Sequence, residues 1–268
     1  MARPLKTPTQ TGFSFVEMVV VIAVLGILAA GSVSFLQFAT EGYGTGGRRA
    51  ELATAASTGT ARMAIELEDA LPNSVRISGS CLEFVPVTEV TRYLTLPLGS
   101  PGTSLQLVAP DSSGVVLMPA RLVVDGESTA ATYDATLGHL SPTATFSAPD
   151  AGGVVTATLS APYTFAGESP RRRIYVTAQP ISFCVDGVRL FRYTNYGWST
   201  AQPLAAALPA TSPDRQLLAD DVAAGVVPFA VLAPSLTRNN IVALALALDG
   251  GGGDTVALHQ SVHLRYVP

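Results

Sequence analysis

The sequence has few charged residues and almost no lysine. Both shortages reduce the number of functions that the chain can be expected to have. Charged residues make up 13% of the 268 residues, Lys6 is the only lysine, and the formal net charge is -4. Removal of a leader that contains Arg3 and Lys6 would take the net charge to -6. A mildly acidic surface gives no reason to expect nucleic acid as a partner.

Motifs of catalysis and metal binding are also missing. The sequence contains no G-x-S-x-G and no Walker-type phosphate loop. His259 and His263 would share one face of a strand but lie about 13 Å apart, too far for one metal ion. Asp220 and Asp221 are adjacent, so in a strand their carboxylates point to opposite faces. We therefore predict no catalytic residue, no metal and no cofactor, and interpret the chain as not an enzyme.

Two further polar runs have simple interpretations. Arg171-Arg172-Arg173 is the only basic run; it could meet an acidic neighbour or lipid headgroups, but we interpret it as a solvated surface turn. Asp249, the glycines of 250–253 and Asp254 superficially resemble a calcium-binding loop. Their acids do not repeat in a pattern, so a hairpin loop is the better interpretation.

Long apolar runs, by contrast, are concentrated near the N-terminus. The 23 residues of 18–40 include no charged residue and would span about 34 Å as an α-helix, which is enough to cross a bilayer. The first twelve residues are polar and carry only basic charges, so they should stay in the cytoplasm while the C-terminal part lies outside. We expect one membrane span followed by a β-rich region.

One acidic residue, Glu17, interrupts this apolar run, and a carboxylate in hydrocarbon usually has a partner. The run Gly12-Phe13-Ser14-Phe15-Val16-Glu17, followed by aliphatic residues, resembles the cleavage and methylation motif of type IV prepilins and type II secretion pseudopilins. The resemblance implies that prepilin peptidase cuts between Gly12 and Phe13 and methylates the new Phe13 amine. Glu17 would then supply the negative charge that the amine of a neighbouring subunit needs.

Two simpler interpretations of the N-terminus remain open. In an ordinary secretory signal peptide, Ala29-Ala30-Gly31 would offer small residues at the cleavage site. In a plain signal anchor, Glu17 would be incidental and paired with some other helix. An acid inside the apolar region and the length of that region argue against the signal peptide.

The helical pattern continues beyond the apolar run. Four glycines within Gly42–Gly47 indicate a hinge, because each costs roughly 1 kcal/mol in a helix interior. A second helical stretch, from Arg48 to Leu71, should end there because Pro72 disfavours helical geometry in the residue before it. The expected organisation is a leader (1–12), an assembly half of the helix (13–41), a hinge with a soluble helical half (42–71) and a periplasmic β-rich domain (72–268).

Strand signals dominate the remainder. Residues 181–185 and 188–193 flank Asp186-Gly187, which predicts a tight hairpin. Residues 240–248 alternate alanine with larger aliphatic residues; we expect the alanine face to lie against the helix, and we expect 255–267 to be an outer strand. Residues 99–170, rich in Pro, Gly, Ser and Thr, are interpreted as an elaboration of the sheet, within one soluble domain.

Cysteines are scarce, since the chain has only Cys81 and Cys184, which stand 103 positions apart. In an exported domain such a pair usually forms a disulfide. Closing a loop of that length would stabilise the fold by about 4 to 5 kcal/mol in the chain-entropy model.

Several downstream patches narrow the resemblance within the prepilin class. Residues 48–52, 70–76, 81–84, the Cys184 hairpin and 263–268 resemble the MshO family of minor pilins of the MSHA pilus. This resemblance implies an α+β, pilin-like fold and a single-pass inner-membrane protein that enters or primes a pilus filament. Its partners would be prepilin peptidase, other pilins, the inner-membrane assembly platform and membrane lipid. The alternatives are a minor pseudopilin of type II secretion, or a membrane-anchored binding module or adhesin with its ligand surface in residues 99–170.

Overall fold

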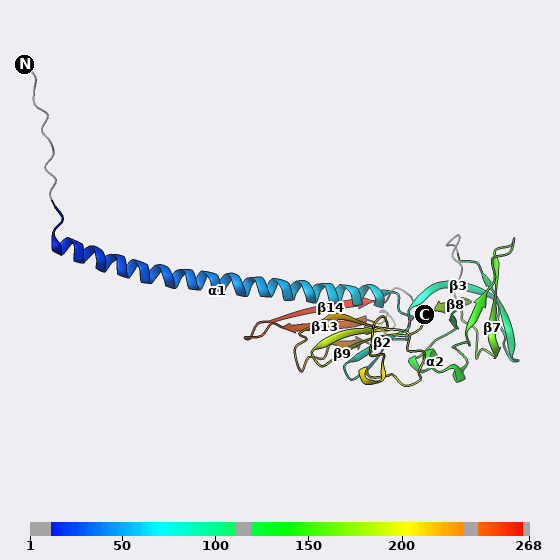
Figure 1. The fold of residues 1–268 in the computed structure, drawn as a ribbon. Helices are drawn as coiled ribbons and strands as arrows, with labels where there is room; N and C mark the ends of the chain where they lie inside the picture. The colour runs from blue at the N-terminus through cyan, green and yellow to red at the C-terminus, as the bar shows by residue number, and fades with distance from the viewer. Residues whose placement is uncertain (1–11, 111–118, 233–240, 265–268) are drawn as a thin grey trace, which may run out of the picture. The chain divides into compact units, whose positions relative to one another are not determined.

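The computed structural model describes residues 12–110, 119–232 and 241–264 (Figure 1). The chain forms two compact units, residues 1–50 and residues 51–268. Helix α1 (Phe15–Glu68) begins in the first unit and ends in the second, and the strands all belong to the second. An apolar N-terminal helix followed by antiparallel sheets is the predicted α+β, pilin-like architecture, which is therefore confirmed.

Helix α1 ends three residues earlier than the sequence predicts. The last helical residue is Glu68, not Leu71. The backbone of the next residues bonds to the sheet instead, because Leu71 N donates to Val85 O (2.8 Å) and Val87 N donates to Asp69 O (2.8 Å). An isolated antiparallel bridge between Ala70 and Pro86 thus replaces the last helical turn before Pro72.

Two antiparallel sheets accompany the end of α1. A five-stranded sheet has the order β1-β2-β9-β10-β11, and a three-stranded sheet has the order β12-β13-β14. The strands are β1 (Arg76–Ser78), β2 (Cys81–Phe84), β9 (Ile181–Asp186), β10 (Arg189–Tyr193), β11 (Arg215–Ala219), β12 (Phe229–Leu232), β13 (Ile241–Asp249) and β14 (Thr255–His263). The β9–β10 hairpin and the outer position of β14 agree with the sequence-based expectations.

The helix and these sheets share one hydrophobic core, which we call the helix-packed core. Four of the six buried residues of α1 are small: Ala56, Gly59, Thr60 and Ala64. The residues that β13 contributes to this core are large: Val242, Leu244, Leu246 and Leu248. A Cβ built on Gly59 would lie 3.6 Å from the Leu246 side chain. The expectation that the alanine face of β13 meets the helix is therefore wrong, because the small residues that permit close approach lie on the helix.

A second sheet system occupies much of the segment between β2 and β9. Six strands have the order β5-β8-β3-β4-β7-β6 (Figure 1). Their bounds are β3 (Val87–Thr95), β4 (Gly102–Val108), β5 (Arg121–Val123), β6 (Ala144–Phe146), β7 (Val154–Tyr163) and β8 (Arg173–Thr177). The two ends of this sheet meet, since Ala120 and Ala144 exchange backbone hydrogen bonds of 3.1 and 2.7 Å.

This closure makes a small barrel with its own core, which we call the barrel core. Every one of the six strands contributes to it: Tyr93, Leu105, Leu107, Leu122, Ala144, Val155, Ala157, Leu159, Ile174 and Val176 are buried there. The expectation that residues 99–170 elaborate the helix-packed sheet is thus wrong. These residues supply four of the six strands of a separate sheet, and the apolar faces of that sheet pack on one another rather than on α1.

One two-stranded ribbon runs from the helix-packed part into the barrel. Phe84 pairs with Ile181 in β2–β9, Ala178 N donates to Pro86 O (3.0 Å), and Val87 pairs with Thr177 in β3–β8. Beside this ribbon lies a third cluster of seven buried residues, which joins the two parts: Leu71, Val85, Val87, Val123, Tyr133, Leu140 and Tyr175. The short helix α2 (Thr129–Tyr133) contributes Tyr133 to it, and 3-10 turns occur at Ala135–Leu137 and Ala205–Ala207.

Cys81 and Cys184 are joined by a disulfide at the other end of the same ribbon. They stand directly opposite each other in the β2–β9 pair, with their Cα atoms 4.1 Å apart. Such a separation belongs to a pair of residues that do not exchange backbone hydrogen bonds, whose side chains lie close together. Both cysteines are buried.

A buried ion pair lies next to the disulfide-bonded strands. Glu83 is fully buried and accepts hydrogen bonds from Arg76 Nε (2.6 Å) and from the Tyr196 hydroxyl (3.2 Å). Arg76 also donates to the carbonyls of residues 199–200 and stacks 3.6 Å above the ring of Tyr133. Burial raises the pKa of Glu83 above its ordinary value, although the hydrogen bond from Arg76 acts in the opposite direction.

Candidate cleavage and assembly site

The expected cleavage position lies immediately before α1. Residues 1–11 of the expected leader lie outside the described residues, and Gly12 precedes the helix in an irregular segment. A Cβ built on Gly12 would meet nothing within 4 Å, and Phe13 is 81% exposed. A protease could therefore approach the Gly12–Phe13 bond, and glycine lets an extended backbone enter such an active site without a side chain in the way.

Glu17 stands in the first turn of α1. The Met18 N–H already bonds to the Ser14 carbonyl at 3.1 Å, so the helical hydrogen-bond pattern starts close to the expected new N-terminus. A carboxylate in this turn interacts favourably with the positive end of the helix dipole. Glu17 is exposed, and so its carboxylate is accessible to a group from another chain.

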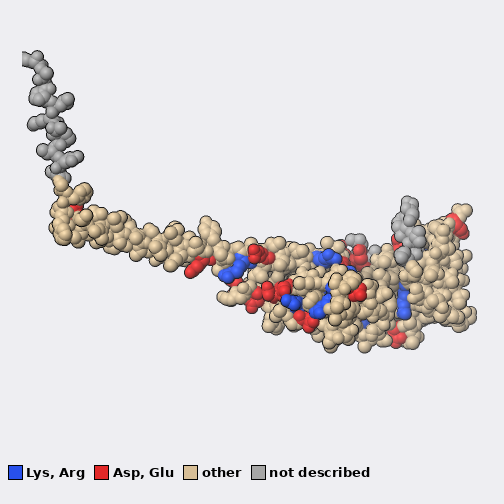
Figure 2. All heavy atoms as spheres, in the orientation of Figure 1, with Lys and Arg blue, Asp and Glu red and all other residues tan. Residues whose placement is uncertain are grey.

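The helix that follows is apolar on all sides. Its most apolar stretch is not buried at all in this chain. Figure 2 shows the N-terminal part of α1 almost free of charged atoms. Length and composition therefore suit a single membrane span near the N-terminus.

Hydroxyl groups within this helix are satisfied locally. Ser32 donates to Leu28 O (2.8 Å), and Ser34 donates to Ala30 O (3.2 Å). Such bonds to the preceding turn allow hydroxyls to enter a lipid environment without losing a hydrogen bond. The same residues are helical, so the alternative signal-peptide cut after Gly31 would fall inside a regular helix.

The glycine-rich stretch of Gly42–Gly47 is helical as well. Thr45 Oγ1 donates to the carbonyls of Glu41 (2.9 Å) and Gly42 (3.1 Å). A Cβ would meet no neighbour within 4 Å at any of the four glycines, so packing within this chain does not require glycine there. The proposed hinge stays a prediction.

Residues 8–33 match the family model of the prokaryotic N-terminal methylation motif. This match supports a type IV pilin-like protein. The motif implies processing by prepilin peptidase and assembly through contacts between pilins. It covers Gly12, Phe13 and Glu17, and it suggests a structural subunit rather than an enzyme. No curated protein and no solved structure matches the chain.

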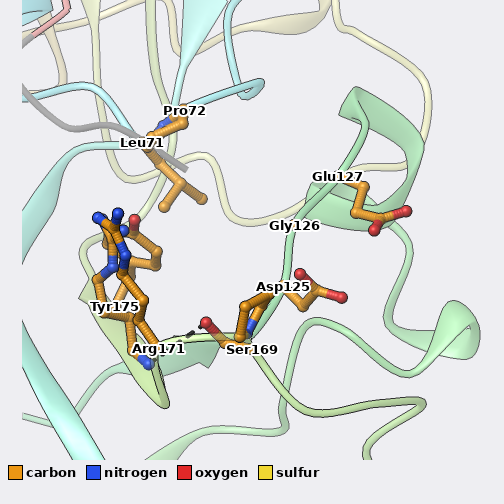
Figure 3. Close-up of a pocket in the computed structure, with 10 residues that line it drawn as sticks. Leu71, Pro72, Asp125, Gly126, Glu127, Ser169, Arg171 and Tyr175 are labelled. Carbon is orange, nitrogen blue, oxygen red and sulfur yellow. Dashed lines mark hydrogen bonds between the residues drawn. The ribbon is translucent and has the colours of Figure 1, made fainter.

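The remaining residues that the sequence analysis considered lie elsewhere. His259 and His263 are both on β14, opposite Ala245 and Ile241, and the described part of the chain contains no cluster of three metal-binding side chains. The glycines of 250–253 form the β13–β14 hairpin loop, as expected. Sequence reasoning missed a cavity beside Arg171 (Figure 3), since its lining comes from three separate segments and no local motif marks it.

Proposed function

We propose that this chain is a minor pilin, a subunit that primes or enters a type IV pilus and resembles the MshO family of the MSHA pilus. Prepilin peptidase cuts it between Gly12 and Phe13 and methylates the Phe13 amine. The apolar half of α1 then holds the subunit in the inner membrane, with the second unit in the periplasm, until the assembly platform moves it into a filament.

The observation that carries this proposal is the matched motif at the start of an exposed apolar helix. The motif supplies the glycine, the phenylalanine and the acid at the fifth position after the cut. The helix buries none of its most apolar window against its own chain. An apolar surface of this kind requires lipid before assembly and other helices after it.

A mass measurement of the protein from its own membranes tests the processing step. With a functional prepilin peptidase we expect a chain that begins at Phe13 and carries one methyl group. Without the peptidase we expect the leader to be retained. Gly12→Val should also retain the leader, because the branched side chain obstructs the cleavage site. A chain that begins at Met1 or at Ser32 in both strains would overturn the proposal.

A variant at Glu17 tests assembly separately from processing. Glu17→Gln should be cut and inserted normally but should be depleted at least tenfold from isolated filaments, because the amine of a neighbouring subunit loses its counter-charge. Glu41→Gln removes an acid beyond the apolar run and serves as the matched control. Equal incorporation of both variants would contradict the assembly role of Glu17.

A minor pseudopilin of type II secretion would share the same motif and the same helix. The two assignments differ in the machinery that uses the subunit. Deletion of the gene should abolish or shorten surface pili while leaving protein secretion intact. Loss of secretion with normal pili would replace the pilin assignment with the pseudopilin one.

A further inference from the structure

Strand β14 is the longest edge strand in the part of the chain that the structure describes. It has nine residues, stands at the end of the β12-β13-β14 sheet and pairs with β13. The other edges are blunted in ways that proteins use against unwanted pairing. Strand β1 has three residues and β12 four, β11 carries Arg215 and pairs with a register shift, and the barrel sheet closes through Ala120 and Ala144.

The hydrogen bonds of β13 show which backbone groups of β14 point away from the sheet. Alternate residues of β13 bond on the side away from β14, to the segment between β11 and β12: Asp249 N to Asp221 O (2.7 Å), Ala223 N to Ala247 O (2.8 Å) and Ala245 N to Pro228 O (2.9 Å). In an antiparallel sheet, such residues do not exchange hydrogen bonds with the strand on their other side. Their partners Thr255, Ala257 and His259 therefore direct N–H and C=O away from β13.

The same direction holds to the end of the strand. The β13–β14 register continues without a shift to the pair of Ile241 and His263, so Ser261 and His263 also point their backbone groups outward. All five of these outward residues are exposed. No described strand other than β13 bonds to β14. A row of N–H and C=O groups is thus available to a further strand.

The side chains of β14 do not block this edge. Its sequence, TVALHQSVH, contains no lysine, arginine, carboxylate or proline, the residues that usually protect an edge strand. One face of β14 contributes Leu258 and Val262 to the helix-packed core. A strand that suits this edge is therefore uncharged, with aliphatic side chains beside Leu258 and Val262 and small or hydroxyl side chains beside Ala257 and Ser261.

We propose that β14 pairs with an extended, uncharged strand of a neighbouring pilin of a different kind. This inference rests on the proposed function, because the N-terminal motif implies assembly through contacts between pilins. Backbone hydrogen bonds hold the added strand, and its alternating side chains continue both faces of the sheet.

The direction of α1 argues against a second copy of this chain as the partner. A Cβ built on Gly250, in the β13–β14 loop, would lie 2.7 Å from the Leu52 side chain, whereas Gly59 lies farther along, beside Leu246. Helix α1 and β14 therefore run in the same direction (Figure 1). Two copies joined edge to edge about a two-fold axis have antiparallel β14 strands, and their α1 helices run in opposite directions. Subunits anchored in one membrane by their N-terminal helices share one direction.

A photo-crosslink from β14 identifies the partner. His259 is replaced by benzoylphenylalanine in cells that make the filament, and adducts are collected from chains that begin at Phe13 and have entered filaments. We expect an adduct with another protein that carries the methylation motif, joined through a strand of that protein. The same replacement at Leu217, exposed on β11, is the control and should give little or none of this adduct.

The outcomes separate this inference from the proposed function. Incorporated chains without an adduct at His259 would overturn the strand pairing and leave the subunit function standing. Chains that are never cut or incorporated would overturn the subunit function as well. Adducts that join only copies of this chain would overturn the choice of partner.

Variants at Ser261 separate backbone pairing from side-chain contact. Ser261→Pro removes an N–H that β13 does not use, so the chain should fold while the added strand loses a hydrogen bond. It should lower the adduct yield at His259 about tenfold, whereas Ser261→Ala keeps the N–H and should change the yield less than about twofold. Ser261→Lys leaves the backbone intact, places a charge on the edge and should lower the yield several-fold. An unchanged yield in both Ser261→Pro and Ser261→Lys would overturn the backbone pairing.

Discussion

The helix-packed core and the barrel core bury their apolar side chains in different ways. In the helix-packed core, small residues of α1 allow a close approach by the large aliphatic face of β13. In the barrel core, a closed sheet surrounds its own side chains, and no residue of α1 takes part. The helix therefore contributes side chains to one core and none to the other.

Charge separates the two parts as well. The helix-packed part contains buried or half-buried ion pairs, between Arg192 and Glu66 (2.8 Å) and between Arg76 and Glu83 (2.6 Å). Strands β4, β6 and β7 of the barrel, by contrast, contain no charged residue. Several of their exposed positions carry hydroxyl or amide side chains instead, such as Ser104, Gln106 and Thr158. Packing and backbone pairing hold this wall of the barrel together.

Truncation of one buried leucine in each core tests whether the two cores unfold independently, and it should have the largest effect. Leu246→Ala in the helix-packed core and Leu105→Ala in the barrel core should each cost about 2 to 5 kcal/mol, because both side chains are fully buried. Hydrogen exchange of the full-length protein in detergent should quicken in α1, β13 and β14 for the first variant. For the second it should quicken in the barrel strands alone.

Leu217→Ala, at an exposed position of β11, is the control and should change stability by no more than about 0.5 kcal/mol. Faster exchange throughout the second unit in both leucine variants would show that the two cores unfold as one. The distinction between them would then have no thermodynamic meaning.

The disulfide offers a second, smaller test. The pairing of Val87 with Thr177 already closes most of the loop between Cys81 and Cys184 whenever the barrel is folded. Only roughly 14 residues then remain for the disulfide to constrain, and its contribution falls from nearly 5 to about 3 kcal/mol. Urea unfolding of the Cys81→Ser/Cys184→Ser variant should therefore show a loss of about 3 kcal/mol.

A loss near 5 kcal/mol would mean that the barrel unfolds together with the helix-packed part. Introducing Leu105→Asp to unfold the barrel gives the matched background. In that background, the effect of the two serine substitutions should rise toward the larger value.

The smallest predicted effect is the pH dependence of stability that Glu83 causes. It concerns the helix-packed part alone. Because burial raises the folded-state pKa of Glu83, the folded protein binds a proton more tightly there than the unfolded chain. The contribution of Glu83 to the free energy of unfolding is fully present below the unfolded-state pKa of about 4.5. It is lost as the pH rises through the folded-state pKa. The loss is about 1.4 kcal/mol for each unit that separates the two values.

Glu83→Gln keeps the size of the side chain and removes the titration. The difference in unfolding free energy between the unaltered protein and this variant, followed from pH 4 to pH 8, should fall as pH rises. A difference that rises over that interval would mean that Arg76 outweighs burial. Exchange in the barrel strands should not depend on this substitution.

The sequence predicts correctly those elements that depend on residues close together in the chain. The apolar run, the β9–β10 hairpin at Gly187 and the outer strand β14 follow from hydrophobicity, turn chemistry and alternation. The sequence predicts the end of α1 too late because Leu71 bonds to Val85, a partner fourteen positions away that no local rule indicates. The choice of face for β13 failed for a related reason, since periodicity separates two faces without saying which one a helix will meet.

Features that depend on pairing between residues far apart in the chain could not be predicted from the sequence. Closure of the barrel rests on Ala120 and Ala144, two residues whose type says nothing about pairing. The cavity draws on Pro72, Asp125 and Arg171, each in a separate segment, and the basic run around Arg171 was interpreted only as a surface turn. The motif at Gly12, Phe13 and Glu17 was found because its residues are contiguous.

The ribbon that carries the barrel also bears on how such a protein can evolve. The chain leaves at Pro86 and returns at Ala178, two neighbouring residues joined by a backbone hydrogen bond of 3.0 Å. A tight turn could join these points and leave β2 and β9 as an ordinary hairpin. A different domain could be inserted at this position, provided that the two ends of its chain lie side by side. Such an exchange would alter the barrel and leave the N-terminal methylation motif and helix α1 unchanged.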